Sequence, residues 1–218
     1  MNRLLALWHS TVGKKVAIAL SGILLVGFLI SHMASNVLVF VDPAKLDAYA
    51  EWLRGFGALL WVARAGLLAL VLIHIAAAWQ LTQRAREARP RNYARAERQV
   101  STYAARTMRW GGVLILVFIV YHILHYTTGT LHPDFVPGEV GRNLVVGMQV
   151  PWTAVFYAVT MVAIGAHFYH GIWSVFQTLG LNHPAWNQSR ICIALGLTLL
   201  VAGGFLSIPL AALFGLLH

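Results

Sequence analysis

Cysteine and charged residues are scarce in this sequence, and each shortage excludes a class of protein. The 218 residues include a single cysteine, Cys192, so the chain forms no intrachain disulfide and no cysteine-ligated iron–sulfur cluster. Only 11% of the residues are charged and 59% are hydrophobic, which leaves too little polar surface to cover a water-soluble protein of this size. A glycine motif for binding a dinucleotide is also absent. The composition predicts an integral membrane protein.

Five apolar stretches are long enough to cross a bilayer. They cover residues 16–38, 57–80, 109–128, 151–178 and 190–215. Each has roughly 20 residues or more, enough for about 30 Å of hydrocarbon at about 1.5 Å per residue. Helices are expected because lipid offers no partner for backbone amides, and the alternating strands of a barrel are absent. We predict an all-α membrane protein whose single domain, residues 1–218, is a bundle of five transmembrane helices. The first stretch is longer than a signal-peptide core and is expected to be retained.

Basic residues are concentrated on one side of this predicted topology. That side has Glu87 and Glu97 and twelve basic residues: Arg3, Lys14, Lys15, Arg84, Arg86, Arg89, Arg91, Arg95, Arg98, Arg106, Arg109 and Arg190. The other side has Lys45, Arg54 and Arg142 with Asp42, Asp47, Glu51, Asp134 and Glu139. Basic loops remain in the cytoplasm, so we expect a cytoplasmic N-terminus and an external C-terminus. The arginine-rich loop either follows this rule alone and binds anionic lipid, or docks a soluble partner.

Histidines recur at membrane depth, with either one histidine or one pair of histidines, here called a station, on each of the first four predicted helices. They are His32, His74, the pair His122/His125 and the pair His167/His170. Ionisable side chains are costly in hydrocarbon, and a neutral imidazole is a good axial ligand for haem iron in the core of a helical bundle. The pattern predicts two haems, each held by two histidines. Interhelical hydrogen bonding is the alternative for any single histidine, whereas a proton relay is disfavoured because no predicted helix contains an acid.

The depth of each station sorts the histidines into two pairs. At about 1.5 Å per residue, His32 lies about 25 Å from the cytoplasmic edge and His74 about 15 Å. The two histidines of the third helix lie about 20 and 24 Å deep, which matches His32. Those of the fourth helix lie nearer to the depth of His74. We expect helix one to pair with helix three near the outer face, and helix two with helix four near the inner face.

Several sequence blocks around these histidines resemble a known family. They are STVGKK (residues 10–15) with SG (21–22), HMASN (32–36), RAGLL (64–68), ARP (88–90), YHIL (121–124) and HFYHGIWSVFQTLG (167–180). Together they are similar to the single-chain dihaem cytochrome b membrane anchors, of the b558 type, of succinate dehydrogenase and fumarate reductase (succinate:quinone oxidoreductase). The resemblance covers nearly the whole chain.

The resemblance implies which histidines are the axial ligands of two b haems. Carried over residue by residue, His32 and His122 bind the outer haem, and His74 and His167 bind the inner one. Depth alone slightly favours His125 over His122, whereas the YHIL context favours His122. On the fourth helix His167 precedes a glycine by four residues, as the family pattern requires, and His170 is the alternate.

The remaining expectations concern smaller roles and partners. Arg64 either meets haem propionates or extends to the interface, and the candidate quinone-site residues are Ser10, Lys14, Trp173 and Gln177. Glycines either admit a flat macrocycle or, as is commoner, serve helix packing.

The resemblance further implies electron transfer in the bacterial cytoplasmic membrane, with no dicarboxylate active site in this chain and no nucleic-acid partner. The expected partners are a flavoprotein subunit and an iron–sulfur subunit on the cytoplasmic face, membrane lipid, and a quinone, expected to be menaquinone. The alternatives are a dihaem anchor of another membrane dehydrogenase and a non-haem transporter, which would have broken helices or repeats.

Overall fold

The computed structural model describes residues 3–88 and 102–217, which form helices and no strands. The elements are α1 (Arg3–His9), α2 (Thr11–Asn36), η1 (Val37–Phe40), α3 (Pro43–Arg54), α4 (Ala58–Glu87), α5 (Tyr103–His122), η2 (Ile123–Thr127), α6 (Val140–Gln149), α7 (Pro151–Thr178), η3 (Pro184–Trp186) and α8 (Asn187–Leu213). Part of the predicted arginine-rich loop lies outside the described residues, namely Arg89, Pro90, Arg91, Tyr93, Arg95, Glu97 and Arg98.

Five helices are long and apolar enough to cross a membrane, which confirms the predicted fold class. The candidate spans are Thr11–Phe40, Ala58–Glu87, Tyr103–Thr127, Pro151–Thr178 and Pro184–Leu213. The span Pro151–Thr178 has the expected bounds, whereas the other four are extended at one or both ends, where polar or amphipathic turns continue the helix. The short helices α1, α3 and α6 were not expected from hydropathy.

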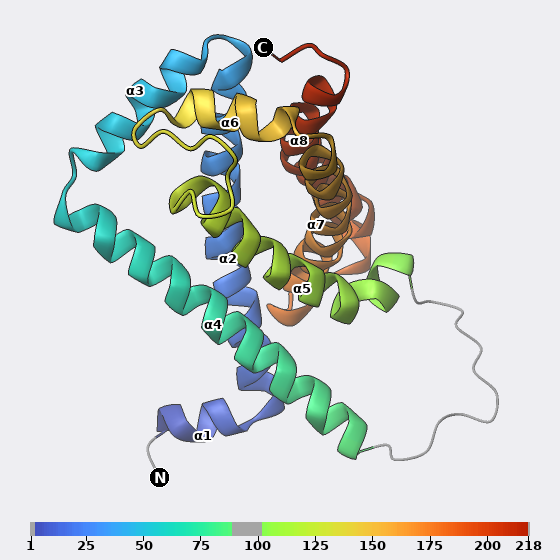
Figure 1. Ribbon diagram of the computed structural model, residues 1–218. Coiled ribbons are helices and arrows are strands. Elements are labelled where there is room, and N and C mark those ends of the chain that lie inside the picture. The colour runs from blue at the N-terminus through green and yellow to red at the C-terminus, as the bar shows by residue number, and fades with distance from the viewer. Residues whose placement is uncertain (1–2, 89–101, 218) are drawn as a thin grey trace.

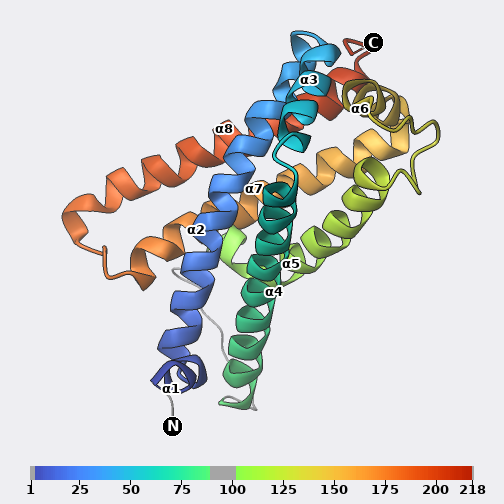
Figure 2. The same cartoon turned by 90° about the vertical axis from the view of Figure 1, so that its left-hand side faces the viewer.

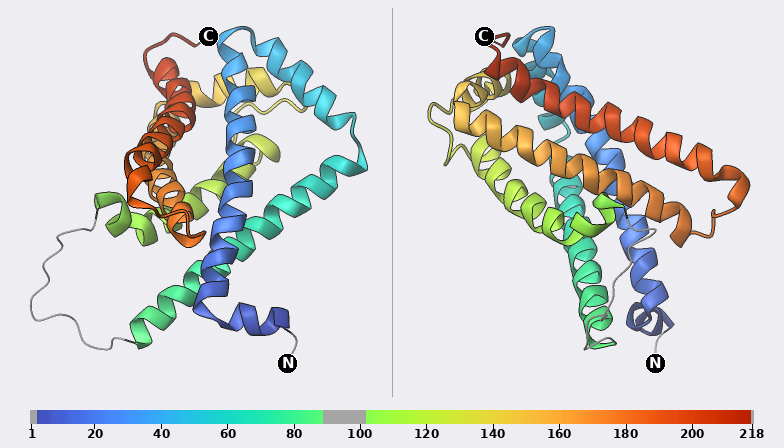
Figure 3. Two further views of the ribbon diagram at one scale, coloured as in Figure 1. Left: turned by 180° about the vertical axis from the view of Figure 1, so that it is seen from behind. Right: turned by 90° about the vertical axis from the view of Figure 1, so that its right-hand side faces the viewer.

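The long helices form two layers that cross. In one, α2 and α4 run side by side (Figure 2); in the other, α5, α7 and α8 lie together with α7 in the middle (Figure 3). Helix α2 also packs against α7 and α8, and so joins the layers. Helix α4 packs mainly against α2, and Ala77 is its one fully buried residue. The side of α4 that faces away from α2 is therefore largely free of protein.

Local capping chemistry sets where the helices begin. The Ser10 hydroxyl accepts a hydrogen bond from the Gly13 amide at 2.8 Å and starts α2, and the Thr102 hydroxyl does the same for α5 through the Ala105 amide. The Asp42 carboxylate accepts from the Ala44 amide at the start of α3. These side chains satisfy amides that have no partner inside the helix.

Helices α3 and α6 and the C-terminus gather at one end of the bundle, which we call the cap end (Figure 1). The opposite end, with α1, is the α1 end. Gly141 of α6 lies directly against the backbone of Pro43, and its amide donates to the Asp47 carboxylate of α3 at 2.8 Å. A side chain at Gly141 would collide with the Pro43 carbonyl. The cap therefore depends on a glycine at this contact.

The variant Gly141→Ala should destabilise the protein by about 1–3 kcal/mol, the usual range for overpacking a tight contact. Unfolding in detergent measures this loss. Gly196→Ala is the matched control, because a Cβ there meets no atom within 4 Å. Equal stability of the two variants would contradict the close contact between α3 and α6.

Candidate functional site

Two pairs of histidines face each other between helices. The first joins α2 to α5 near the cap end, where the ring centroids of His32 and His122 are 5.8 Å apart and the ring planes make an angle of 85°. Phe28 and Phe205 flank the His32 ring, with centroids 5.2 and 5.7 Å away, and Phe118 flanks His122 at 5.6 Å. This pair therefore sits in an aromatic, apolar environment.

The second pair joins α4 to α7. The ring centroids of His74 and His167 are 6.3 Å apart, with an angle of 52° between their planes. The His74 ring lies against Ser21 and Gly22 of α2. Ser21 is 11 residues before His32 on the same helix, so at about 1.5 Å per residue the two stations are about 16 Å apart along α2.

The spacing of both pairs suits two imidazoles that share one metal. Metal–imidazole bonds are about 2 Å long, so two rings on opposite sides of a metal have centres on the order of 6 Å apart. In the described residues no group of three or more His, Cys, Asp or Glu side chains gathers as a metal site. The histidines meet in twos, which fits axial ligation of a macrocycle whose own nitrogens complete the coordination.

The glycines of the long helices differ in how closely other protein atoms approach them. Gly111, Gly112 and Gly171 are half-buried, yet a Cβ at any of them would meet no atom within 4 Å. Gly165 behaves differently, because a Cβ there would lie 3.2 Å from Ala202 of α8. Gly165 thus serves helix packing, as expected for most of the glycines, whereas the other three have no described protein atom in that position.

The Nδ1 atoms of the four histidines have different partners. Nδ1 of His74 lies 3.0 Å from the Ser21 hydroxyl, and Nδ1 of His122 lies 3.3 Å from the Tyr157 hydroxyl. Nδ1 of His32 is 3.3 Å from the Asn36 amide nitrogen on its own helix. Nδ1 of His167 is buried without a partner. None of these contacts occupies Nε2, the nitrogen that each ring has left for a ligand.

The alternates His125 and His170 lie differently from His122 and His167. His125 is fully buried, and its ring stacks on that of His132 with centroids 5.0 Å apart. Among the described residues the ring that meets His32 is that of His122, and the ring that meets His74 is that of His167. His170 is half-buried on α7.

A buried polar cluster around His125 was missed by the sequence analysis. Tyr126 packs on the His125 ring with centroids 4.1 Å apart, and His132 Nε2 donates to the Asn143 carbonyl at 2.8 Å. A Cβ at Gly147 of α6 would lie within 3.0 Å of Tyr126, His132 and His125. His132 follows the predicted third span in a loop, so no hydropathy signal marks it. The π-helical turn η2, which follows His122, is the kind of irregularity that occurs often at functional sites.

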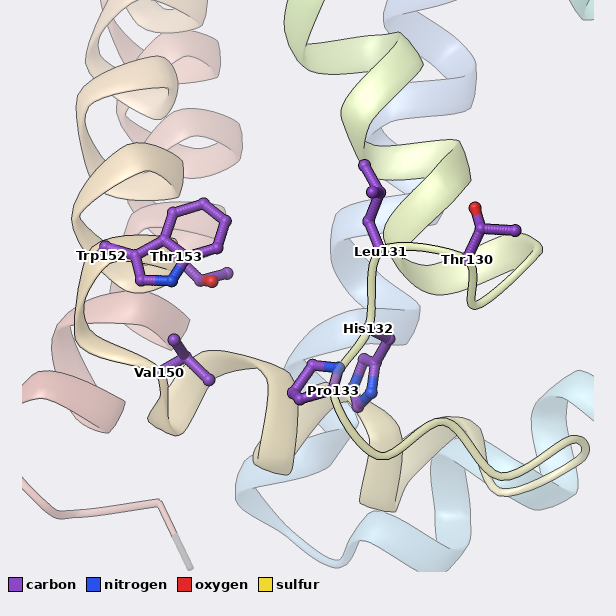
Figure 4. Close-up of a pocket in the computed structure, with 7 residues that line it drawn as sticks. All are labelled: Thr130, Leu131, His132, Pro133, Val150, Trp152 and Thr153. Carbon is purple, nitrogen blue, oxygen red and sulfur yellow. The ribbon is translucent and has the colours of Figure 1, made fainter.

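His132 also lines a pocket of about 300 Å³ at the cap end (Figure 4). The pocket lies between the loop after η2 and the start of α7. Its lining residues are Thr130, Leu131, His132, Pro133, Val150, Trp152 and Thr153. Three of its seven side chains carry a hydroxyl or imidazole, and the rest are apolar.

Of the candidate quinone-site residues, Gln177 lines a pocket at the α1 end. That pocket has a volume of about 320 Å³ and is lined by Val12, Lys15, Ser174, Gln177 and Thr178. Ser10 caps α2. Lys14 is buried, donates to the Trp8 carbonyl at 2.6 Å and lies over the Trp8 ring.

Two arginines occupy contrasting positions. Arg64 is exposed on α4, with its guanidinium 4.8 Å from the centroid of the Trp61 ring; its role toward a propionate remains a prediction. Arg190 is buried at the α7–α8 turn, where it lies over the Trp173 ring and donates to the side chains of Asn182 and Asn187. The candidate Trp173 is therefore covered by a cation that locks the turn.

Five candidate membrane spans packed as a bundle define an all-helical membrane protein. The family model of the succinate dehydrogenase/fumarate reductase transmembrane subunit matches residues 83–204. The chain belongs to this family. No curated protein and no solved structure matches the chain significantly. The matched segment contains His122, His125, His167 and His170, whereas His32 and His74 precede it.

Proposed function

We propose that this chain is the membrane-anchor cytochrome b subunit of a succinate dehydrogenase or fumarate reductase complex, with two bis-histidine b haems. His32 and His122 hold one haem, and His74 and His167 hold the other. The observation that carries the proposal is the pair of interhelical ring contacts, 5.8 and 6.3 Å between centroids. Membership of the family supports the same function.

Histidine and aromatic side chains of this chain account for the proposed haem binding. Each haem bound in this way supplies a one-electron carrier between an iron–sulfur subunit and membrane quinone. The histidines present Nε2 from helices on opposite sides, since α2 faces α5 and α4 faces α7. The aromatic rings of Phe28, Phe118 and Phe205 exclude water from the cap-end pair.

Charge supports an orientation with the α1 end in the cytoplasm. Described basic residues at or near that end include Lys15, Arg84, Arg86, Arg106 and Arg109, whereas acidic residues cluster on α3 and around α6. By the positive-inside rule the cap end faces outward. A flavoprotein subunit and an iron–sulfur subunit would then dock on the α1 end. Menaquinone as the quinone, and the bacterial cytoplasmic membrane as the location, are parts of the same proposal.

A dihaem anchor of another dehydrogenase would share the four ligands, and the family match favours the succinate dehydrogenase or fumarate reductase complex over it. A transporter would use helices broken in mid-membrane. The five spans are instead continuous through their middle, and the irregular turns η1, η2 and η3 lie at the ends of spans.

Haem content tests the function directly. A reduced-minus-oxidised spectrum of the purified complex, combined with haem and protein quantification, should give two b haems per chain. Copurification of a flavoprotein and an iron–sulfur protein should accompany them. One haem per chain, or none, would reject the four-ligand assignment.

The pairing predicts which variants resemble each other. His32→Ala and His122→Ala should each remove the same haem, because each removes one of two axial ligands, and His74→Ala and His167→Ala should remove the other. Redox titration with electron paramagnetic resonance identifies the remaining haem. His183→Ala is the matched control, since His183 caps η3 on the surface. If His32→Ala and His122→Ala removed different haems, the pairing would be wrong.

A further inference from the structure

In each facing pair, one histidine is held by a hydroxyl from another helix. Ser21 of α2 holds His74 of α4, and Tyr157 of α7 holds His122 of α5, with contacts of 3.0 and 3.3 Å. The other histidine of each pair has no hydroxyl from another helix among the described residues. Asn36 reaches His32 from the same helix, and Nδ1 of His167 has no hydrogen-bond partner there. Both hydroxyls belong to buried residues, with Ser21 3% and Tyr157 4% exposed.

The direction of the Ser21 hydrogen bond follows from its second partner. A serine hydroxyl has one hydrogen, and the Ala17 carbonyl lies 2.7 Å from the Ser21 oxygen and takes it. The contact with His74 must then run the other way, with Nδ1–H donating to the Ser21 oxygen. A neutral imidazole that carries its hydrogen on Nδ1 has a free lone pair on Nε2. Ser21 therefore holds His74 in the tautomer that binds iron.

Tyr157 is shared between the two histidines of the third span. Its hydroxyl lies 3.3 Å from Nδ1 of His122 and 3.2 Å from Nδ1 of His125. The hydroxyl has a single hydrogen, so it donates to at most one of the two imidazoles. A histidine that donates its Nδ1–H to the hydroxyl keeps a free Nε2 lone pair. Tyr157 is therefore placed to hold one of the two in the tautomer that binds iron.

The surroundings of the two rings differ. The His122 ring faces His32, the other half of the proposed ligand pair, whereas the His125 ring stacks on His132. As the proposed ligand, His122 needs a free Nε2, and its Nδ1–H then donates to the Tyr157 hydroxyl.

We propose that Tyr157 and Ser21 are positioning residues, one for each haem, that fix the tautomer and ring orientation of His122 and His74. This inference rests on the proposed bis-histidine function. An acceptor on the far nitrogen makes a ligating imidazole more basic, and losing such a partner typically weakens metal binding by about 10–100-fold. A more basic ligand stabilises the oxidised iron, so removal of the hydroxyl raises the midpoint potential.

The test uses the purified complex with four variants that delete a hydroxyl and one that keeps it. Tyr157→Phe should raise the midpoint potential of the haem that His122→Ala removes, and Ser21→Ala that of the haem that His74→Ala removes, each with haem dissociation faster by about 10–100-fold. Two controls delete hydroxyls that touch no histidine nitrogen: Tyr121→Phe, whose buried hydroxyl has no partner, and Ser207→Ala, whose hydroxyl bonds only the Gly204 carbonyl. Both should keep the wild-type potentials. Ser21→Thr keeps a hydroxyl at this position and should keep the wild-type midpoint potential, unlike Ser21→Ala.

A variant of His125 tests whether His125 is an axial ligand. His125→Ala should retain both haems, and loss of a haem would overturn the assigned direction of the Tyr157 hydrogen bond. Unchanged potentials in both hydroxyl variants, or a shift of the same haem by both, would overturn the inference while the two wild-type haems leave the proposed function standing. A wild-type complex without haem would overturn both.

Discussion

The constraint on which this structure depends is the cost of a polar imidazole in a membrane. Hydrocarbon offers no hydrogen-bond partner, so any partner of a buried imidazole must come from the bundle or from a ligand. A neighbouring helix provides one for one histidine of each facing pair. Helix α2 carries His32 and supplies Ser21 to His74, and α7 carries His167 and supplies Tyr157 to His122. These two helices thus serve both stations, and they are the elements that join the layers.

The looseness of α4 follows from the same arrangement. A helix that packed its whole face against neighbours would leave no room for a flat cofactor, whereas α4 buries only Ala77 completely and contacts α7 through the His74–His167 rings. The cap end is built in the opposite way. There α6 and α3 meet through Gly141, and the aromatic cluster of Phe118, Tyr121 and Tyr157 fills the space beside His122. The bundle is open beside α4 and tightly packed where α3 meets α6.

The sequence predicted what depends on hydropathy and helical rise. The five spans follow from apolar runs of sufficient length, and the depth of each histidine follows from counting residues along regular helices. Depth could not separate His122 from His125, which are one turn apart. The helices α1, α3 and α6 were missed because short amphipathic segments carry no spanning signal. His132 and Arg190 acquire their partners only when α6 packs over the loop and α8 turns back on α7.

The choice between His122 and His125 shows why such a site resists prediction from sequence. Both residues lie on nearly the same face of α5 and its π-helical extension, and both are within hydrogen-bonding reach of Tyr157, 35 and 32 residues further along the chain. No local pattern near residue 122 indicates that contact. The two imidazoles differ in their neighbours from other parts of the fold, since the ring of His122 faces His32 of α2 and that of His125 stacks on His132. The difference between the two positions therefore arises from helix packing and cannot be found in the local sequence.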